Sequence, residues 1–369
     1  MILPFNVKKR DNIPKRRIAL ILTVSIILAL VCSGLVLLFF GLNPFQIFGT
    51  IIVGSLGSEM RIQQTIIKAV PLTIASLGIL VAFKMKFWNI GGEGQIMAGA
   101  LGAAWVALNY GTLPQPLLLL LMAIASIICG SVWALIPAFF KAKMGTNETI
   151  FTLMMNYIMI KFVMYLQYGP WKDPASQGFP KIPRFSDNAL LPSVGGVHIG
   201  WIVAIILVAA VFWFMNYTKK GYEIAVVGES VNTARYAGMN IPVIIMIAMS
   251  ISGGLCGLVG MIQISGIERT LTWGVSANFG FTAIITSWLA RLNAITTLFV
   301  CIVFAILLQG ADFIQVAMDV PAAVAGLVQG IILFFVLGSD FFLRYSLNWT
   351  GLASARENAA AGAKGGEVE

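Results

Sequence analysis

Charged side chains and histidine are scarce in this sequence. Only 11% of its 369 residues are Asp, Glu, Lys or Arg, and His198 is the single histidine. A histidine-based metal cluster is therefore excluded, and no nucleophile stands at a recognisable spacing from a base. The sequence also contains no G-x-x-x-x-G-K-[ST] phosphate-binding loop. We therefore expect no enzyme activity, no catalytic residues, no cofactor and no metal.

Cysteine is also rare and shows no pattern that would indicate ligands or disulfides. The four cysteines are far apart, and each lies within an apolar run: Cys32, Cys129, Cys256 and Cys301. Isolated cysteines in apolar surroundings behave as small core residues. Disulfides and zinc are not expected.

Apolar residues, in contrast, are abundant. They make up 59% of the chain before its 37 glycines are counted, whereas globular domains average about 45–50% with glycine included. No soluble domain hides that much apolar surface, so lipid must surround most of the chain. The sequence predicts an all-α polytopic membrane protein.

Ten apolar runs are candidates for membrane-spanning helices. A helix needs about 20 residues to cross the hydrocarbon of a bilayer. The run at 278–290 is too short to span straight. The runs are 18–40, 65–83, 89–109, 117–140, 149–167, 199–216, 241–264, 278–290, 294–311 and 321–338.

Lysine and arginine predict the orientation, because cytoplasmic loops carry an excess of both. With ten spans and a cytoplasmic N-terminus, most of the 24 lysines and arginines fall inside, and both termini are cytoplasmic. Much of the net charge of +9 then lies along the inner face of the membrane, and no nucleic-acid partner is expected. The stretch 44–57, with Pro44 and three glycines, either lies at the interface or re-enters the membrane.

The domain organisation follows from these spans. Residues 1–17 form a basic cytoplasmic N-terminus, and residues 18–338 form the transmembrane domain. Within it, 168–198 is a proline-rich external loop and 218–240 is the longest internal cytoplasmic segment. The small, polar and glycine-rich tail 339–369 is expected to be cytoplasmic and partly disordered.

The predicted cytoplasmic segment 218–240 contains the start and stop signals of a short helix. Ser230 is placed to cap a helix over 231–237, which Gly238 would end in a left-handed conformation. Asn240 and Pro242 then begin the next span. Such a helix suits a docking piece for a partner, although an ordinary connecting loop is the alternative.

Three segments together resemble the membrane permease subunits of bacterial ABC importers for simple sugars and nucleosides. The segment "NIGGEGQ" at 89–95 is similar to the family's N-I-G-x-E-G-Q signature, and "TNETIFTLMMNYI" at 146–158 is similar to its N-E-x-x-x-T-L-M-x-N-Y. The loop "GYEIAVVGESVNTARYAGMN" at 221–240 resembles the family's cytoplasmic loop. There, Ala234 matches only one of the family's paired alanines. The resemblance covers about residues 65–338.

This resemblance implies a function and a set of partners. Two permease subunits, of the same or a related chain, would form the pathway, two ATPase subunits would bind beneath, and a substrate-binding lipoprotein would deliver the solute. The residues that match the coupling loop are Gly221, Arg235, Tyr236, Gly238 and Asn240. ATP hydrolysis is expected on the separate subunit, and the fold is expected to be a pseudo-symmetric inverted repeat.

Three glycines and a carboxylate at the start of the third span suggest a broken helix. Asn89 is placed to cap it on the amide of Gly91 or Gly92. Glu93 and Gln95 would then bond a solute hydroxyl or base edge. Alternatively, the glycines pack closely and Glu93 pairs with Lys84 or Lys86. A loose echo, Asn278-Phe279-Gly280-Phe281, begins the eighth span, as an inverted repeat would require.

The fifth span carries two further polar residues, Asn156 and Lys161, on different parts of its surface. Burying a lysine in mid-membrane costs about 2.5–3.5 kcal/mol. Lys161 therefore either snorkels outward or lines a polar pathway together with Asn156.

The sequence thus predicts the permease subunit of an ATP-driven importer for nucleosides or related sugars. A pentose, hexose or branched-chain amino-acid permease is the alternative within the class. An ion-coupled secondary transporter is the alternative from another class.

Overall fold

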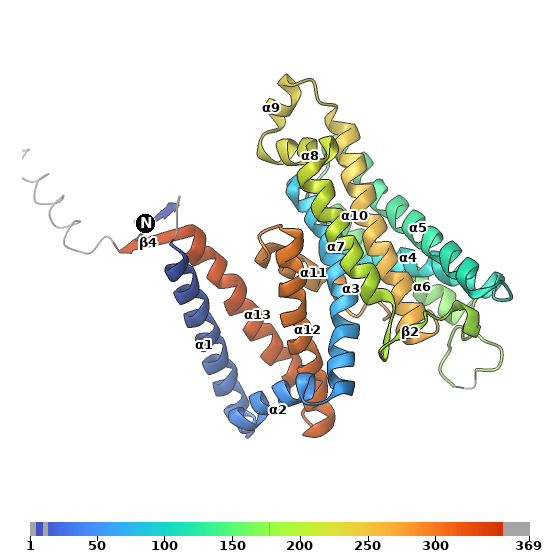
Figure 1. Ribbon diagram of the computed structural model, residues 1–369, viewed down its shortest axis with the longest axis horizontal. Coiled ribbons are helices and arrows are strands. Elements are labelled where there is room, and N and C mark those ends of the chain that lie inside the picture. The colour runs from blue at the N-terminus through green and yellow to red at the C-terminus, as the bar shows by residue number, and fades with distance from the viewer. Residues whose placement is uncertain (1–4, 10–13, 177, 350–369) are drawn as a thin grey trace, which may run out of the picture. The chain divides into compact units, whose positions relative to one another are not determined.

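The protein folds almost entirely into helices. A computed structural model describes residues 5–9, 14–176 and 178–349 (Figure 1). Clustering of contacts divides the chain into two units, one of residues 1–48 and 318–369 and one of residues 49–317. The helical prediction is confirmed, and each of the ten predicted apolar runs coincides with a helix.

The first unit pairs the two ends of the described chain. Helix α1 (Lys15–Phe39) packs against α13 (Ala322–Arg344). Strand β1 (Phe5–Lys9) pairs antiparallel with β4 (Tyr345–Trp349). The N-terminal segment and the start of the predicted tail thus contain a strand each, which the sequence reading missed. Of that tail, residues 350–369 lie outside the described residues.

The second unit contains the remaining helices. It begins within α2, which runs over Pro44–Leu56. The helices that follow are α3 (Glu59–Lys84), α4 (Gly92–Asn109), α5 (Gln115–Met144), α6 (Glu148–Tyr168), α7 (Gly200–Tyr217), α8 (Lys219–Glu229), α9 (Val231–Tyr236), α10 (Ile241–Gln263), α11 (Phe279–Leu289) and α12 (Ala294–Ala317). Short elements connect them: the 3-10 helix η1 (Asp187–Ala189), the hairpin β2 (Ser193–Val194) and β3 (Val197–His198), and the π-helix η2 (Ile264–Glu268).

Helices α3 and α10 lie at the centre of this unit, and α5 and α7 lie at its periphery. The apolar window of α3 is 83% buried and that of α10 with η2 is 61% buried, whereas those of α5 and α7 are each 22% buried. Because a helix that is apolar on all sides needs protein or lipid around it, α5 and α7 present their free faces to lipid.

Glycines let the central helices approach closely. Gly257 of α10 packs against Gly130 of α5 and Gly99 of α4, and a Cβ added at Gly130 would stand 2.7 Å from the Cα of Gly257. Backbones in contact at small residues are typical of membrane helix pairs. Gly253 and Gly257 of α10 therefore lie at close helix contacts. At the similarly spaced Gly326 and Gly330, an added Cβ would meet no atom within 4 Å among the described residues.

The number of spans is only partly visible from length and composition. Among the described residues, six helices are long and apolar enough to cross a membrane: α3, α5, α6, α7, α10 with η2, and α12. A seventh is added if α1 and α2 count as one bent pair. Helix α11 is too short, as expected from its run of apolar residues.

Candidate functional site: the junction of two helix starts

Helix α4 does not begin where α3 ends. After α3, Lys86 adopts a left-handed conformation (φ 57°) and the amide of Phe87 bonds back to the carbonyl of Ala82, which turns the chain inward. Asn89 then reaches α10, where its Nδ2 donates to Ser252 Oγ at 3.0 Å. Ser252 stands about 16 Å along α10 from Ile241, at 1.5 Å per residue. The helix start therefore lies deep inside the unit.

Asn89 and Gln95 brace this start. Each donates its amide hydrogen to the other's oxygen, at 3.1 and 3.0 Å, and Asn89 Oδ1 also accepts from the amide of Gly91 at 3.0 Å. Both side chains are buried. The predicted bond from Asn89 to a glycine amide is confirmed, although α4 itself begins at Gly92.

Helix α6 holds the same loop from the other side. Asn156 Oδ1 accepts from the amide of Gly94 at 2.8 Å, and its Nδ2 donates to the carbonyl of Ile90 at 2.8 Å. Thr152 Oγ1 accepts from the amide of Ile90 at 3.2 Å. These bonds satisfy backbone groups that an irregular loop leaves unpaired at membrane depth.

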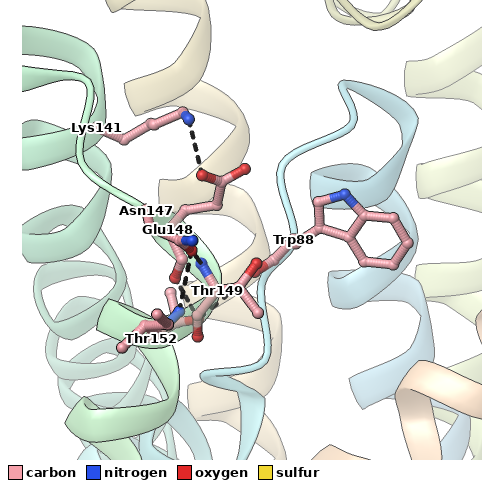
Figure 2. A network of polar contacts seen from close by, with 7 residues as sticks. Trp88, Lys141, Asn147, Glu148, Thr149 and Thr152 are labelled. Atoms are coloured by element: carbon pink, nitrogen blue, oxygen red, sulfur yellow. Dashed lines mark hydrogen bonds and ion pairs between the residues drawn. The ribbon is translucent and has the colours of Figure 1, made fainter.

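The first turn of α6 is fixed in turn to α5 (Figure 2). Asn147 caps α6 on the amides of Thr149 and Ile150, and Lys141 forms an ion pair with Glu148 at 2.8 Å. The indole of Trp88 points away from this network (Figure 2). It joins Phe83 and Trp288 in an aromatic cluster with ring centroids 5.4–5.7 Å apart.

Glu93 joins the start of α4 to the start of α11. Its Oε1 accepts from the amide of Asn278 at 3.0 Å and its Oε2 accepts from the amide of Gly280 at 2.8 Å. A Cβ at Gly280 would stand 2.7 Å from the Cα of Glu93. The carboxylate thus supplies acceptors for first-turn amides of α11, and it lies at the positive ends of two helix dipoles.

The alternative pairing of Glu93 with Lys84 or Lys86 is therefore wrong. The carboxylate is only 2% exposed and its bonds go to backbone amides of a segment far away in the sequence. The sequence offered this pairing as an alternative because Lys84 and Lys86 are the cations closest to Glu93 along the chain.

The structure brings four of the five pathway candidates together and leaves one apart. Asn89, Glu93, Gln95 and Asn156 are all buried around the start of α4. Lys161 lies on the exposed side of α6, so the prediction that it occupies a different surface from Asn156 is confirmed.

The predicted coupling-loop residues lie on α8 (Gly221), on α9 (Arg235 and Tyr236) and in the turn between α9 and α10 (Gly238 and Asn240), at the end of the unit opposite β2 (Figure 1). Ser230 caps α9 on the amide of Thr233, Gly238 is left-handed (φ 72°), and Asn240 caps α10 on the amide of Val243, all as predicted. Tyr236 is 94% exposed. The sequence reading missed α8, which Thr218 caps on the amide of Gly221.

The loop 168–198, which was predicted to be external, is attached to the unit by hydrogen bonds. Gln167 bonds to the carbonyl of Pro180 and the amide of Trp273, and Thr270 bonds to the carbonyl of Ile182. The loop and Asn109–Thr112 border a cavity of about 790 Å³ lined by Lys172 and Arg184. Among the described residues, its lining contains no carboxylate.

The ion pair of Lys68 in α3 with Asp312 in α12 was not predicted from the sequence, and Lys68 also bonds to the carbonyl of Leu308. An aspartate directly after the apolar run 294–311 was the available signal. Across the described residues, no group of three or more His, Cys, Asp or Glu side chains is placed to hold a metal ion.

Known proteins resemble this chain over most of its length. Residues 61–337 match the family model described as branched-chain amino acid transport system / permease component. The chain is 33% identical to a glucose ABC transporter permease protein of Haloferax volcanii, with 94% of this chain and 93% of that protein covered. It is 30% identical to a guanosine ABC transporter permease protein of Bacillus subtilis (87% and 93% covered) and 27% identical to a nucleoside ABC transporter permease protein of Lactococcus lactis (87% and 91% covered).

Proposed function

Because this chain belongs to the family of branched-chain amino acid transport system permease components, we propose that it lines half of the solute pathway of an ATP-driven importer. It is a multi-pass permease subunit of an ABC transporter. The observation that carries the proposal is the junction of α4 and α11, where two short helices begin against each other through Glu93 and Gly280. Discontinuous helices of this kind form solute sites near the bilayer midplane of transporters.

The pathway opens, in this proposal, where the two helix starts separate. Asn89, Glu93, Gln95 and Asn156 are buried, and they form hydrogen bonds with one another, with Ser252 and with backbone groups. Each would exchange such a bond for a solute hydroxyl when α11 moves away from α4. Lys161 is a separate pathway candidate on the exposed side of α6.

We also propose that the two halves form an inverted repeat within ten spans. Helix α3 is followed by a return segment, 85–91, and then α4; helix α10 with η2 is followed by 269–278 and then α11. The two short helices meet start to start, which favours opposite entry into the membrane. The pairing of β1 with β4 supports both termini on one side, and we assign that side to the cytoplasm.

The solute we propose is a nucleoside or a simple sugar. The relatives carry names for glucose, nucleoside and guanosine transport, and these solutes share a ring that bears hydroxyl groups. The cluster of Phe83, Trp88 and Trp288, in which Trp88 is 46% exposed, supports a solute with a flat base. A pentose, hexose or branched-chain amino-acid permease is the alternative within the family.

The proposed complex contains two permease subunits, of the same or a related chain, with two ATPase subunits and a substrate-binding lipoprotein, in a bacterial plasma membrane. ATP hydrolysis belongs to the separate subunit, and α8 and α9 receive its movement. The exposed Tyr236 and the mixed charge of the segment support this role.

Reconstitution tests the proposal. The permease, its ATPase subunits and its binding protein are placed in liposomes, and uptake of radiolabelled uridine and glucose is measured with ATP and with an imposed proton or sodium gradient. We expect uptake to require ATP and to survive collapse of both gradients. Uptake by the chain alone on a cation gradient would instead establish the ion-coupled transporter.

Replacement of Glu93 tests the pathway. In Glu93→Gln one oxygen becomes an amide that faces a backbone N–H donor, so we expect the solute KM or the uptake rate to change about tenfold or more. Glu268→Gln, an exposed carboxylate at the outer end of α10, is the control. Unchanged kinetics in an assembled Glu93→Gln complex would remove Glu93 from the pathway.

The external cavity is our proposed docking surface for the binding protein. Lys172 and Arg184 line it, which suits an acidic projection on the partner. We expect Arg184→Glu to raise about tenfold the concentration of binding protein that half-stimulates ATP hydrolysis. Lys181→Glu, which changes a charge in the same loop outside the cavity lining, is the control. An equal effect of both variants would exclude docking in the cavity.

A further inference from the structure

A second, smaller cavity lies at the other end of the unit, beside α8. Its volume is about 220 Å³, and it is bordered by the last turns of α3 and α7, by α8, and by the turn that joins α11 to α12. Its polar lining is Lys84, Asn216, Arg291 and Asn293, and the remainder is apolar. The mechanism of transport proposed above makes no use of it.

The charged residues that line the cavity are all cationic. Lys84 and Arg291 both line it, and among the described residues its lining contains no carboxylate. The ion pairs found in the described part of the chain join other lysines to their carboxylates: Lys68 to Asp312, Lys141 to Glu148 and Lys220 to Glu223. Two cations that share a small cavity repel each other unless an anion lies between them.

The backbone holds Arg291 at this place. Arg291 and Leu292 are both left-handed (φ 54° and 53°), and their amides bond to the carbonyls of Trp288 and Ser287. A left-handed conformation costs free energy at any residue other than glycine. Such residues are found mainly at ligand and active sites, where the surrounding structure imposes the conformation. Asn293 uses its Oδ1 to accept from the amides of Ile295 and Thr296, so its NH₂ is the group left for a ligand.

The position matches the headgroup layer of the membrane. Lys84 is the last residue of α3, Asn216 stands one residue before the end of α7, and Ala294 begins α12. Basic pockets between helix ends on the cytoplasmic side bind anionic lipid headgroups. The apolar residues Leu80, Phe212 and Met215 line the same cavity and suit the glycerol and first methylenes of a lipid.

We infer that this cavity binds a phosphate group, and that in the membrane the phosphate belongs to an anionic phospholipid. Lys84 and Arg291 hold the phosphate oxygens, the positive end of α12 adds to the field, and the lipid fastens the inner ends of α3, α7 and α12 together. A carboxylate of the ATPase is the less suitable occupant, because the apolar part of the lining would then be left without a partner.

The experiment uses the purified permease complex in detergent, with phosphatidylglycerol, phosphatidylcholine and inorganic phosphate as probes. Retained lipid is counted by native mass spectrometry, and melting temperature is recorded with each probe. We expect wild type to bind phosphatidylglycerol about tenfold more tightly than phosphatidylcholine, and Lys84→Gln with Arg291→Gln to weaken that binding about thirtyfold. Lys143→Gln with Lys181→Gln removes two exposed charges outside the cavity lining and should behave as wild type.

Competition with inorganic phosphate distinguishes a lipid headgroup from free phosphate as the ligand of the cavity. If millimolar inorganic phosphate does not displace the lipid, the lipid is the ligand; if it does and stabilises the protein alone, free phosphate fills the same site. If the double variant does not assemble, the single variant Arg291→Lys is used instead. Because it keeps the positive charge, we expect it to bind phosphatidylglycerol more tightly than phosphatidylcholine. Equal binding of both lipids by wild type, equal loss in the control, or displacement of the lipid by ATPase subunits would overturn the inference.

Discussion

At the scale of single residues, Glu93 and Gly280 decide how closely two helices meet. The carboxylate of Glu93 bonds to an amide 187 residues away, and Gly280 leaves room for the backbone of Glu93. A side chain at position 280 would occupy the space that the junction needs. The contact therefore depends on a missing Cβ as much as on a charge.

We predict that Gly280→Ala weakens this junction by about 1–3 kcal/mol, the usual cost of overpacking a closed core. The added methyl group would overlap the backbone of Glu93 and push α11 away from α4. The melting temperature of the purified complex and uptake should both fall. Gly274→Ala, in the return segment 269–278 that precedes α11, would meet no atom within 4 Å and should be neutral. Equal stability of the two variants would contradict this account.

His198 gives a prediction about pH. It is buried in β3, its Nδ1 accepts from the amide of Gly200, and burial lowers the pKa of its imidazole below the ordinary value of 6.5. The unfolded chain therefore binds a proton at a higher pH than the folded one, so stability present above about pH 6.5 is lost as the pH falls below it.

We expect the melting temperature of wild type to fall more between about pH 7.5 and about pH 5 than that of His198→Gln, whose side chain does not titrate in this range. Because His198 is the only histidine, the difference between the two curves reports this group. If the melting temperatures of the two proteins fell in parallel with pH, protonation of His198 would not destabilise the hairpin of β2 and β3.

At the scale of elements, α9 is a small helix defined by its ends. Ser230 caps its start and the left-handed Gly238 follows its end, so Arg235 and Tyr236 are presented on a fixed turn at the surface. A fixed and exposed turn is suited to transmit a push, whereas a loose loop would absorb it.

We predict that Arg235→Glu uncouples ATP hydrolysis from uptake without unfolding the spans. Charge reversal on the docking helix should reduce solute molecules moved per ATP about tenfold, while the melting temperature stays within about 2 °C of wild type. Gly238→Val, which forces a branched side chain into φ 72°, should act in the same direction. Lys143→Glu at the inner end of α5 is the control, and retained coupling in Arg235→Glu would remove α9 from the docking surface.

At the scale of the whole molecule, the candidate site is formed by two helices, α4 and α11, that would not be chosen as membrane spans from their length and composition. Helix α11 has 11 residues, and α4 is not among the six described helices that are long and apolar enough to span a membrane, yet the two meet at a buried polar cluster. If both enter the membrane as proposed, a count of apolar helices underestimates the number of membrane segments, because a pair of short helices is stabilised by its partners rather than by lipid.

We predict the topology by accessibility of single introduced cysteines to a membrane-impermeant maleimide in whole cells. Ser176→Cys in the external loop should be labelled in intact cells, whereas Lys219→Cys and Asn293→Cys should be labelled only after the membrane is opened. The native cysteines Cys256 and Cys301 are buried and should stay silent in both conditions. Labelling of Asn293→Cys in intact cells would contradict the proposed ten spans.

The amino-acid pattern alone was enough to identify the lipid surroundings, the helical class and the family. Apolar runs report lipid directly, and caps such as Asn89, Ser230 and Asn240 act on amides two or three residues away, so local pattern contains them. The motifs at 89–95, 146–158 and 221–240 lie within the matched family range.

Which segments contact one another became visible only in the folded protein. The bond between Glu93 and Gly280, the pairing of β1 with β4, the ion pair of Lys68 with Asp312 and the cavity that Lys84 shares with Arg291 join positions too far apart for any local pattern to relate. Such contacts depend on how whole helices pack, and a sequence records the helices without recording their neighbours.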